Sequence, residues 1–298
     1  TESNNLAIRG AARASGCPIA VTSLAEHPAT VQPLARLAEQ GWLVHHLSVD
    51  TDGRIDLAGI PAGPMGLGTL ILAQNEVGTI QPVSAVAEKV HSVGGVMHAD
   101  GAQAVGKIPV AVDELAVDFL SIAGHKMYAP KGVGALYVRR GTGIEPVLVG
   151  AGQERGLRPG TENVAGIVGL GAAAELAQGL LNSEPERQRK LRELLWRQLS
   201  AAIPGLVRIS PADNCLPNTL MVAVQDHIGS DLLDTLDGVA ASTGSACHSG
   251  VHTPAATLLE MGIESQLALG ALRLSIGRAT TQSDIHTAAT ALAATVTA

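Results

Sequence analysis

The regular alternation of strand-like and helix-like segments in the first half of the chain is the feature that most restricts its fold. Short runs rich in β-branched residues or leucine occur at residues 18–24, 41–49, 68–74, 95–100, 117–124 and 134–140. Alanine-rich segments with a helical pattern lie between several of these runs, at residues 2–15, 28–40 and 83–93. Such alternation predicts an α/β fold, with a mostly parallel sheet that carries helices on both faces.

After residue 162 the pattern changes. Two long helices are predicted at residues 163–181 and 183–203, and shorter strand-like and helix-like runs then follow in a different order, at residues 205–210, 218–224, 231–238 and 271–277. We therefore expect a domain boundary near residue 182. The prediction is a large domain over residues 1–182 and a smaller C-terminal α+β domain over residues 183–298.

The composition narrows the class of protein. Hydrophobic residues make up 46% of the 298 residues and charged residues 16%, which is typical of a globular core. The net charge is −7 and there is no basic run, so we expect no direct binding of nucleic acid. No apolar stretch is long enough to span a bilayer and no signal peptide opens the chain, so we expect a cytoplasmic protein without a membrane partner. The cysteines Cys17, Cys215 and Cys247 are too few and too scattered for a disulfide framework, and we expect no metal site.

Polar side chains follow four of the predicted strands, at the point where each strand ends. His27, Asn75 and Asp100 come at or after three of them, and the pair His125 and Lys126 follows the fourth. Each has an ordinary explanation alone: a solvated histidine, an aspartate that caps the next helix, or a lysine exposed in a turn. Ligands of open α/β sheets bind outside the carboxyl ends of the strands. Together, these residues therefore indicate a binding site.

A lysine beside a carboxylate at such an edge suggests a particular chemistry. Desolvation lowers the pKa of a lysine, and the free amine of Lys126 can then form a Schiff base with an aldehyde. Pyridoxal phosphate (PLP) is bound in this way, with an acid on its ring nitrogen, and Asp100 can supply that acid. Gln103 can donate to the phenolic oxygen and His27 can lie against the ring. A helix starting within residues 1–5 suits the phosphate.

Several motifs then carry a resemblance to a known family. They occur in order along nearly the whole chain and read TESNNLAI, QNEVGTIQPV, HADGAQAVGKIPV, SIAGHKMYAPKGVGALYVRRG, GQERGLRPGTENV, STGSACHSG and ALRLSIGR. The sequence closely resembles the PLP-dependent cysteine desulfurases, the NifS/IscS-like branch of the class-V aminotransferase family within fold-type I. This resemblance implies a homodimer and a seven-stranded, mostly parallel sheet in the large domain. Members of the family carry a segment before the TESNN motif, which the large domain is expected to lack here.

The resemblance also implies roles for individual residues. Lys126 would be the Schiff-base lysine, Asp100 would pair with the pyridinium nitrogen, and His27 would stack on the ring as a catalytic residue. The remaining implied contacts are Gln103 with the phenolic oxygen, Thr1 and His125 with the phosphate, Thr161 with the phosphate of the neighbouring subunit, and Asn75 and Arg273 with the substrate carboxylate. A planar guanidinium is suited to bidentate binding of a carboxylate, although Arg273 alone is better explained as a surface ion pair.

Cys247 lies in a run of small residues, STGSACHSG, which we interpret as a flexible loop without helical or strand pattern. An isolated cysteine is usually a small core residue. By the resemblance, however, Cys247 is the nucleophile: it attacks the sulfur of the substrate L-cysteine, alanine leaves, and a persulfide remains. Cys17 and Cys215 match no family site and are interpreted as structural.

The preferred hypothesis is a cysteine desulfurase that passes sulfur to an acceptor protein, for iron–sulfur cluster assembly, tRNA thiolation or DNA phosphorothioation. The alternative within enzymes is a selenocysteine lyase or another PLP-dependent C–S lyase, which needs no thiol such as Cys247. The alternative of another class is a non-catalytic sulfur-relay or scaffold protein. A scaffold has no need of Lys126 and Asp100 together, which argues against it.

Overall fold

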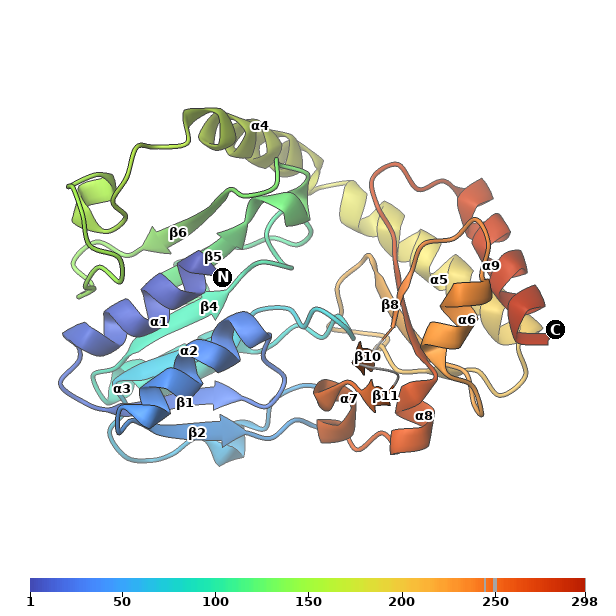
Figure 1. The fold of residues 1–298 in the computed structure, drawn as a ribbon, viewed down its shortest axis with the longest axis horizontal. Coiled ribbons are helices and arrows are strands. Elements are labelled where there is room, and N and C mark those ends of the chain that lie inside the picture. The colour runs from blue at the N-terminus through green and yellow to red at the C-terminus, as the bar shows by residue number, and fades with distance from the viewer. Residues whose placement is uncertain (244, 249–250, 298) are drawn as a thin grey trace. The chain divides into compact units, whose positions relative to one another are not determined.

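The computed structural model describes residues 1–243, 245–248 and 251–297, and it divides into two compact units (Figure 1). Unit 1 comprises Thr1–Ser48, Ile55–Gln74 and Gln81–Gly179, and unit 2 comprises Val49–Arg54, Asn75–Ile80 and Leu180–Ala298. The main division lies beside the boundary expected near residue 182. Unit 2 also takes two short segments from the first half of the chain. That the two regions fold as separate domains stays a prediction.

Unit 1 is built on a six-stranded sheet in the order β2-β1-β3-β4-β5-β6. Its strands are β1 (Ile19–Ser23), β2 (Leu43–Leu47), β3 (Leu67–Ile71), β4 (Val96–Asp100), β5 (Phe119–Ala123) and β6 (Gly134–Val138). All neighbouring pairs are parallel except β5 and β6, which are antiparallel. The α/β architecture predicted from the alternating pattern is thus confirmed.

The expected number of seven strands is wrong for the described part of the chain. The six strand-like runs of the sequence coincide with the six strands of this sheet. A seventh strand had no run of its own, because it came from the family resemblance and not from a hydrophobic pattern.

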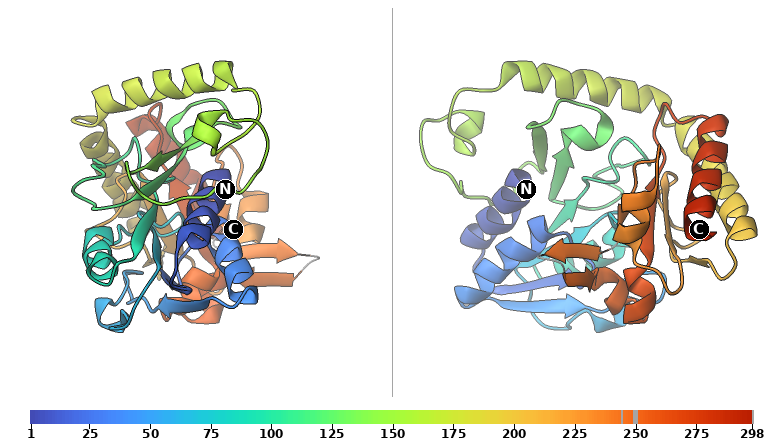
Figure 2. Two further views of the ribbon diagram at one scale, coloured as in Figure 1. Left: turned by 90° about the vertical axis from the view of Figure 1, so that its left-hand side faces the viewer. Right: turned by 45° about the vertical axis from the view of Figure 1, so that its right-hand side comes forward.

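Helices cover both faces of this sheet. Helices α1 (Glu2–Ala14) and α2 (Pro28–Glu39) lie on one face, and α3 (Val83–Ser92) lies on the other, as Figure 2 shows from two further sides. The buried side of α1 presents Ala7, Ile8 and Ala11, whose spacing forms one apolar stripe. These residues share a core with Leu67 of β3 and Phe119 of β5, so α1 is held directly over the sheet.

Helix α4 (Val164–Leu180) is covered much less. Only Gly166, Ala173 and Ala177 are buried along it, whereas Val164, Ile167, Val168 and Leu176 are exposed. No single helix in the described ranges is long and apolar enough to cross a membrane; α4 and α5 (Glu184–Ala202) pass that test only when taken together.

Unit 2 contains a four-stranded antiparallel sheet in the order β7-β8-β12-β9. Its strands are β7 (Val207–Arg208), β8 (Thr219–Ala223), β9 (Ser242–Thr243) and β12 (Ala271–Ser275), and its further helices are α6 (Gly229–Thr235), α7 (Ala256–Glu260), α8 (Ser265–Leu269) and α9 (Gln282–Thr297). Strand β8 is buried along its whole length because each face has its own cover. Leu220 and Val222 pack in a core formed with α5 and α9, and Met221 and Ala223 pack in a second core formed with α7 and α8.

Strands β10 (Ser245–His248) and β11 (Val251–Pro254) form an antiparallel pair in which Cys247 stands opposite His252. The interpretation of the STGSACHSG run as a loop without strand structure is therefore wrong for Ser245–His248, and it is also wrong for Ser242–Thr243, which form β9. Small residues give no alternation of apolar and polar side chains, but their backbones form the hydrogen bonds between strands just as those of large residues do. Residues 244, 249 and 250 of this run lie outside the described residues, and so does the side chain of Cys247.

Short 3-10 helices complete the elements, at η1 (Leu57–Gly59), η2 (Gly124–Met127) and η3 (Glu154–Gly156).

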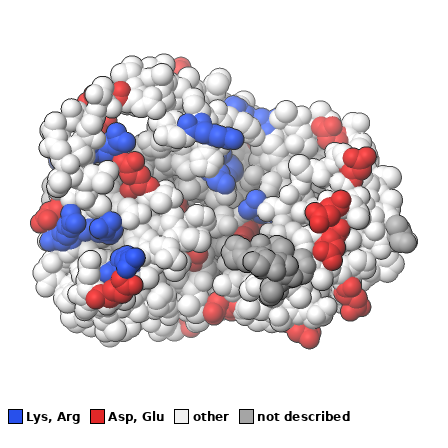
Figure 3. Space-filling view, in the orientation of Figure 1, with Lys and Arg blue, Asp and Glu red and all other residues white. Residues whose placement is uncertain are grey.

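On the face drawn in Figure 3, lysine and arginine side chains form several separate groups and no continuous basic surface.

Candidate functional site

Lys126 lies in η2, which directly follows β5, a strand whose first three residues are buried. Gly124 makes this connection possible: a Cβ there would lie 2.8 Å from the carbonyl oxygen of Val133, so any side chain would clash with the backbone. Tyr128 ends η2 in the left-handed conformation, with φ of 70°, which is uncommon for a residue other than glycine. His125 and Lys126 are both exposed at this edge of the sheet.

His125 is poor at holding a proton in this position. Although His125 is exposed, some desolvation of its ring, together with the positive charges of Lys126 and Lys131, lowers the pKa of its imidazole. At neutral pH His125 is therefore a neutral ring that can offer one donor and one acceptor.

Asp100 ends β4 and is only 4% exposed. Its Oδ2 accepts a hydrogen bond from Asn4 Nδ2 at 2.7 Å, and its Oδ1 accepts one from the backbone N–H of Ala102 at 2.9 Å. Residues 102–104 after the strand form turns and not a helix. The carboxylate is thus held by one donor on each oxygen, and each oxygen keeps a further lone pair.

Asn4 comes from the first turns of α1 and is 2% exposed. Besides its bond to Asp100, its Nδ2 donates to Thr30 Oγ1 of α2 at 3.1 Å. One amide nitrogen therefore joins α1, α2 and β4. The sequence analysis gave no role to Asn4, although it belongs to the TESNN motif.

Glu26 is a second residue to which the sequence analysis gave no role. It is buried after β1, where its Oε1 accepts from Ser23 Oγ at 2.7 Å and from the backbone N–H of Ile71 at 3.0 Å. Its Oε2 is buried and has no hydrogen-bond partner among the described residues. Burial, with a smaller contribution from the charge of Asp100, raises the pKa of Glu26 to about 8. Glu26 is therefore mostly protonated at neutral pH.

His27 follows Glu26 and forms the N-cap of α2. Its Nδ1 accepts from the backbone N–H of Ala29 at 3.0 Å, so the neutral ring carries its hydrogen on Nε2. The ring is exposed. A histidine is an unusual cap, and here the capping bond fixes the tautomer.

A third buried residue, His98 of β4, stands behind Asp100. Its Nδ1 lies 2.7 Å from Thr69 Oγ1 of β3, and its Nε2 lies 2.9 Å from Ser121 Oγ of β5. Burial lowers the pKa of His98 to about 4, so the ring is neutral at physiological pH. His98 therefore links the three neighbouring strands β3, β4 and β5, two residues before Asp100 in β4.

Gln103 is oriented by a lysine. Lys107 Nζ donates to Gln103 Oε1 at 2.6 Å and to the Gln103 backbone carbonyl at 3.0 Å. Because the amide oxygen accepts from Lys107, the Nε2 group of Gln103 is the part of the side chain that can donate elsewhere.

Thr1 is the N-cap of α1, and its side chain makes no capping hydrogen bond. The hydrogen bond from Asn5 N–H to Thr1 carbonyl opens the helix, so the N–H groups of the preceding turn have no acceptor within the helix. Thr161 lies exposed in the segment before α4. The unit 1 residues named in the sequence analysis thus fall at the carboxyl ends of strands, at the start of α1, or, for Thr161, in this segment.

Asn75 and Arg273 belong to unit 2, and the structure brings them together. Arg273 Nη1 donates to the backbone carbonyl of Asn75 at 2.8 Å. Arg273 stands opposite Met221 in the β8–β12 pairing, so it faces the same side of the sheet as Met221. Its Nε is buried and has no hydrogen-bond partner among the described residues. Among the described residues, Arg273 forms no ion pair of the kind considered in the sequence analysis.

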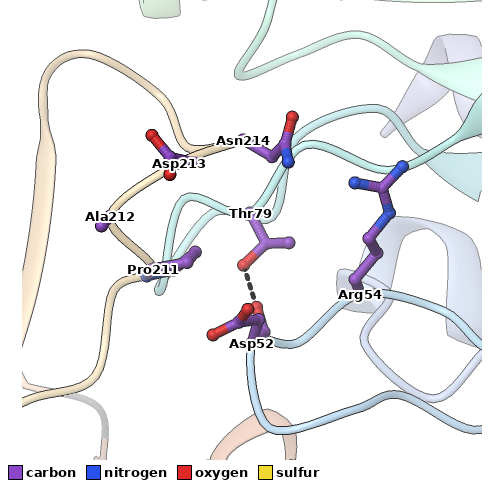
Figure 4. A pocket seen from close by; sticks show the side chains of 7 residues that line it. All are labelled: Asp52, Arg54, Thr79, Pro211, Ala212, Asp213 and Asn214. Atoms are coloured by element: carbon purple, nitrogen blue, oxygen red, sulfur yellow. Dashed lines mark hydrogen bonds between the residues drawn. The ribbon is translucent and has the colours of Figure 1, made fainter.

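Other features of unit 2 do not coincide with the expected site. A pocket of about 270 Å³, lined by Asp52, Arg54, Thr79, Pro211, Ala212, Asp213 and Asn214, contains none of the residues named from the sequence (Figure 4). Burial raises the pKa of the Cys215 thiol, which makes it a poor nucleophile. Within the described ranges, no group of three histidine, cysteine, aspartate or glutamate residues is placed to hold a metal ion.

Comparison with known proteins agrees with this geometry. The class-V aminotransferase family matches residues 1–287. A cysteine desulfurase of Gluconacetobacter diazotrophicus is 42% identical over 96% of this chain and 73% of its own length. The cysteine desulfurase NifS of Azotobacter vinelandii is 40% identical over 96% of this chain and 72% of its own length.

Solved structures give the same result. A NifS-like protein superposes with a TM-score of 0.91 at 33% identity, over 99% of this chain and 80% of that chain. SspA, solved in complex with cysteine, superposes with a TM-score of 0.77 at 31% identity, over 92% of this chain and 78% of its own.

A sheet edge with a lysine and a buried aspartate, together with a match over residues 1–287, shows that the chain belongs to the class-V aminotransferase family. Within this family its relatives at about 40% identity are NifS/IscS-like cysteine desulfurases, and the chain is one of that group.

Proposed function

We propose that the protein is a fold-type I PLP enzyme that converts L-cysteine to L-alanine and transfers the sulfur to Cys247. The desulfurase relatives support this reaction. The observation that carries it is the buried Asp100 carboxylate, held by a donor on each oxygen at the edge of the sheet where Lys126 is exposed.

The residues of unit 1 fit this cofactor. A pyridinium N–H needs a fixed carboxylate, and Asp100 has a free lone pair on each of its anchored oxygens. The start of α1, with Thr1 at its N-cap, supplies backbone N–H groups and the positive end of a helix dipole for a phosphate. His125 would add a neutral donor, Gln103 Nε2 would face the phenolic oxygen, and Lys126 Nζ would hold the cofactor covalently.

When bound, PLP supplies an electron sink for the negative charge that develops at the substrate α-carbon. His27 can deliver a proton from Nε2, because its Nδ1 is engaged by the α2 backbone. The tautomer of His27 is thus set before any ligand arrives.

Arg273 and Asn75 would hold the substrate carboxylate. The buried Nε of Arg273 has no partner among the described residues, and a carboxylate oxygen would satisfy it. The bond from Nη1 to the Asn75 backbone carbonyl fixes the plane of the guanidinium. An N–H pair of a fixed guanidinium binds a carboxylate with defined orientation.

Cys247 would take the sulfur. Its Sγ forms an S–S bond with the substrate sulfur as the substrate C–S bond breaks, and alanine leaves with the electron pair and a proton. The outer sulfur of the persulfide then passes to an acceptor protein of iron–sulfur cluster assembly, tRNA thiolation or DNA phosphorothioation, and Cys247 is left as a thiolate. We propose that this takes place in the cytoplasm without direct nucleic-acid contact. A simple C–S or selenocysteine lyase would not need this thiol.

We also propose a homodimer, in which Thr161 reaches the phosphate site of the neighbouring subunit. The exposed apolar residues of α4, which include Val164, Ile167, Val168 and Leu176, support it because such groups of residues are usually covered by a partner.

The test compares wild type with Cys247→Ala and Lys126→Ala. We expect wild type to show the visible absorption of the bound cofactor and, with an added thiol that reduces the Cys247 persulfide, to release alanine and sulfide from L-cysteine. Cys247→Ala should keep the absorption and lose the sulfide release, and Lys126→Ala should lose both. Sulfide release that is indifferent to Cys247→Ala would favour the lyase, and a colourless wild type would favour the scaffold protein.

A further inference from the structure

We propose that Asn4 is the positioning residue that fixes the Asp100 carboxylate for the ring nitrogen of the cofactor. The proposal rests on the proposed function, because it needs PLP to bind at Asp100. It adds a residue of α1 that would touch neither cofactor nor substrate.

The hydrogen bonds of Asn4 carry the proposal. Its Nδ2 donates to Asp100 Oδ2 at 2.7 Å and to Thr30 Oγ1 at 3.1 Å. An amide nitrogen has two hydrogens, and both are therefore used. The side chain cannot rotate without breaking both bonds, and at 2% exposure water cannot easily replace them.

Asn4 holds the Asp100 carboxylate from an element other than the strand that carries Asp100. The other oxygen of Asp100 is held by the N–H of Ala102, which belongs to the turn that follows β4 itself. Asn4 is the only one of these two donors that comes from a separate element. It therefore fixes the rotation of the carboxyl group about its χ angles, whereas the Ala102 bond alone would leave Oδ2 free to move.

The same contact connects two parts of the cofactor site. Asn4 lies in the first turn of α1, whose N-cap is Thr1, and Thr30 lies in the first turn of α2, whose N-cap is His27. A shift of either helix start would pull on Asp100 Oδ2 through this amide. Asn4 thus couples the phosphate end of the site and the stacking histidine to the acid on the ring nitrogen.

Removing the donor should change the proton on the ring nitrogen. The hydrogen bond from Asn4 Nδ2 holds Asp100 Oδ2 in place. Without it, the carboxyl group can turn away from the ring nitrogen. The ring nitrogen then lacks a fixed negative partner and is less protonated.

The experiment uses the full chain reconstituted with PLP that carries 15N in its ring. For Asn4→Ala we expect the ring 15N resonance to move toward the value of unprotonated pyridine, and the Kd for PLP to rise roughly 10-fold, the size of one hydrogen bond to a charged group. Thr30→Val, which keeps the volume and leaves the Asn4–Asp100 bond in place, should give a smaller shift in the same direction. It keeps the proposal testable if Asn4→Ala does not fold.

Asn5→Ala is the matched control. Asn5 is the next residue of α1, and its side chain bonds to the backbone of Thr1 and not to Asp100. The ring resonance should stay at its wild-type value in this variant. A wild-type resonance and a wild-type Kd in Asn4→Ala, or in Thr30→Val where Asn4→Ala does not fold, would overturn the proposal.

A failure of the proposed function would give different experimental results from a failure of the role proposed for Asn4. In that case wild-type protein would not bind PLP, or Asp100→Asn would leave the ring resonance unchanged. With wild type and Asp100→Asn as expected, an unaffected Asn4→Ala overturns the role of Asn4 alone.

Discussion

Asp100 in unit 1 and Arg273 in unit 2 are two charged groups that are expected to bind ligands, and their surroundings differ. Each oxygen of Asp100 already accepts a protein N–H, from Asn4 and from Ala102. Arg273 has one fixed bond, from Nη1 to the Asn75 carbonyl, and a buried Nε with no partner among the described residues.

The difference shows how the two groups would meet their ligands. A carboxylate that accepts one bond on each oxygen is stable without ligand and accepts one more donor at little cost, which suits a cofactor that stays bound. A buried N–H without acceptor carries a desolvation penalty of roughly 1–3 kcal/mol, which an incoming carboxylate removes. That arrangement suits a substrate that binds and leaves in each cycle.

The largest effect is expected from Asp100→Asn. An amide cannot stabilise a positive ring nitrogen as a carboxylate does, and we expect kcat/KM for alanine formation to fall by about 10²–10³, the typical loss for one preorganised electrostatic contact. Asp113→Asn is the control, since that carboxylate is exposed and pairs with Arg139. A loss of only a few-fold in Asp100→Asn would contradict the view of unit 1 as the cofactor site.

Glu26 gives a test of the buried network that needs no ligand. Its folded pKa of about 8 lies above its unfolded value of 4.5, so between these pH values the unfolded chain binds fewer protons than the folded chain. Stability from this residue is therefore full below pH 4.5 and falls as the pH rises toward 8, by about 1.4 kcal/mol per pH unit.

Glu26→Gln keeps the shape and removes the titration. Between pH 5.5 and 7.5 we expect the free energy of unfolding of wild type, relative to Glu26→Gln, to drop by roughly 3 kcal/mol in urea titrations. His98 is present in both proteins and cancels from the comparison. If the free energy of unfolding had the same pH dependence in the two proteins, Glu26 would be ionised in the folded protein, and the charge of the buried network around Glu26 would differ from the one described.

A smaller effect is expected from Arg273→Lys in unit 2. Lysine keeps the charge but loses the planar guanidinium, so we expect the KM for L-cysteine to rise about 10-fold, with a smaller change in kcat. Arg36→Lys, in an exposed pair with Glu39, should leave both constants at wild-type values. Equal losses in kcat and kcat/KM for Arg273→Lys would instead indicate a contact made only in the transition state.

The smallest effect concerns Gln103. Lys107→Met removes the donor to Gln103 Oε1 and lets the amide turn over. One neutral hydrogen bond is worth about 0.5–1.5 kcal/mol, so PLP affinity should weaken only a few-fold. The measurement is a titration of apoprotein with PLP followed by visible absorption, and an effect as large as that of Asn4→Ala would show that Gln103 matters more than its position suggests.

The sequence was most informative where hydrophobic runs are continuous. All six strands of the unit 1 sheet were predicted, because β-branched runs between helices leave few alternatives. The pair β10–β11 was missed because Ser245, Ala246 and Cys247 are small and give no alternation. Helix α9 was also not predicted, although Gln282–Thr297 is rich in alanine.

The site shows the same limit. Residues that bind the cofactor by resemblance were named, whereas Asn4, Glu26 and His98 were not. Their roles depend on contacts between elements far apart in the chain: Asn4 and Asp100 are 96 residues apart, and Ile71 and Glu26 are 45 apart. Neither composition nor periodicity reports which buried polar groups will meet, so only the tertiary structure identifies this network.

The segment Asn75–Ile80 belongs to unit 2, although segments of unit 1 lie on both sides of it in the sequence. This affects how the chain can fold during synthesis and how it can be divided into fragments. Val77 lies in the core of unit 2, and its carbonyl accepts from Ser210 Oγ, 133 positions later in the chain. During synthesis, this segment cannot make its contacts in unit 2 until most of the second half of the chain has been made. A fragment that begins after the main division would lack Val77, which leaves a gap in the core that Val77 shares with Met221. The small unit is thus assembled from three pieces of polypeptide, and the Asn75–Ile80 piece makes its contacts only after much of the third piece has been synthesised.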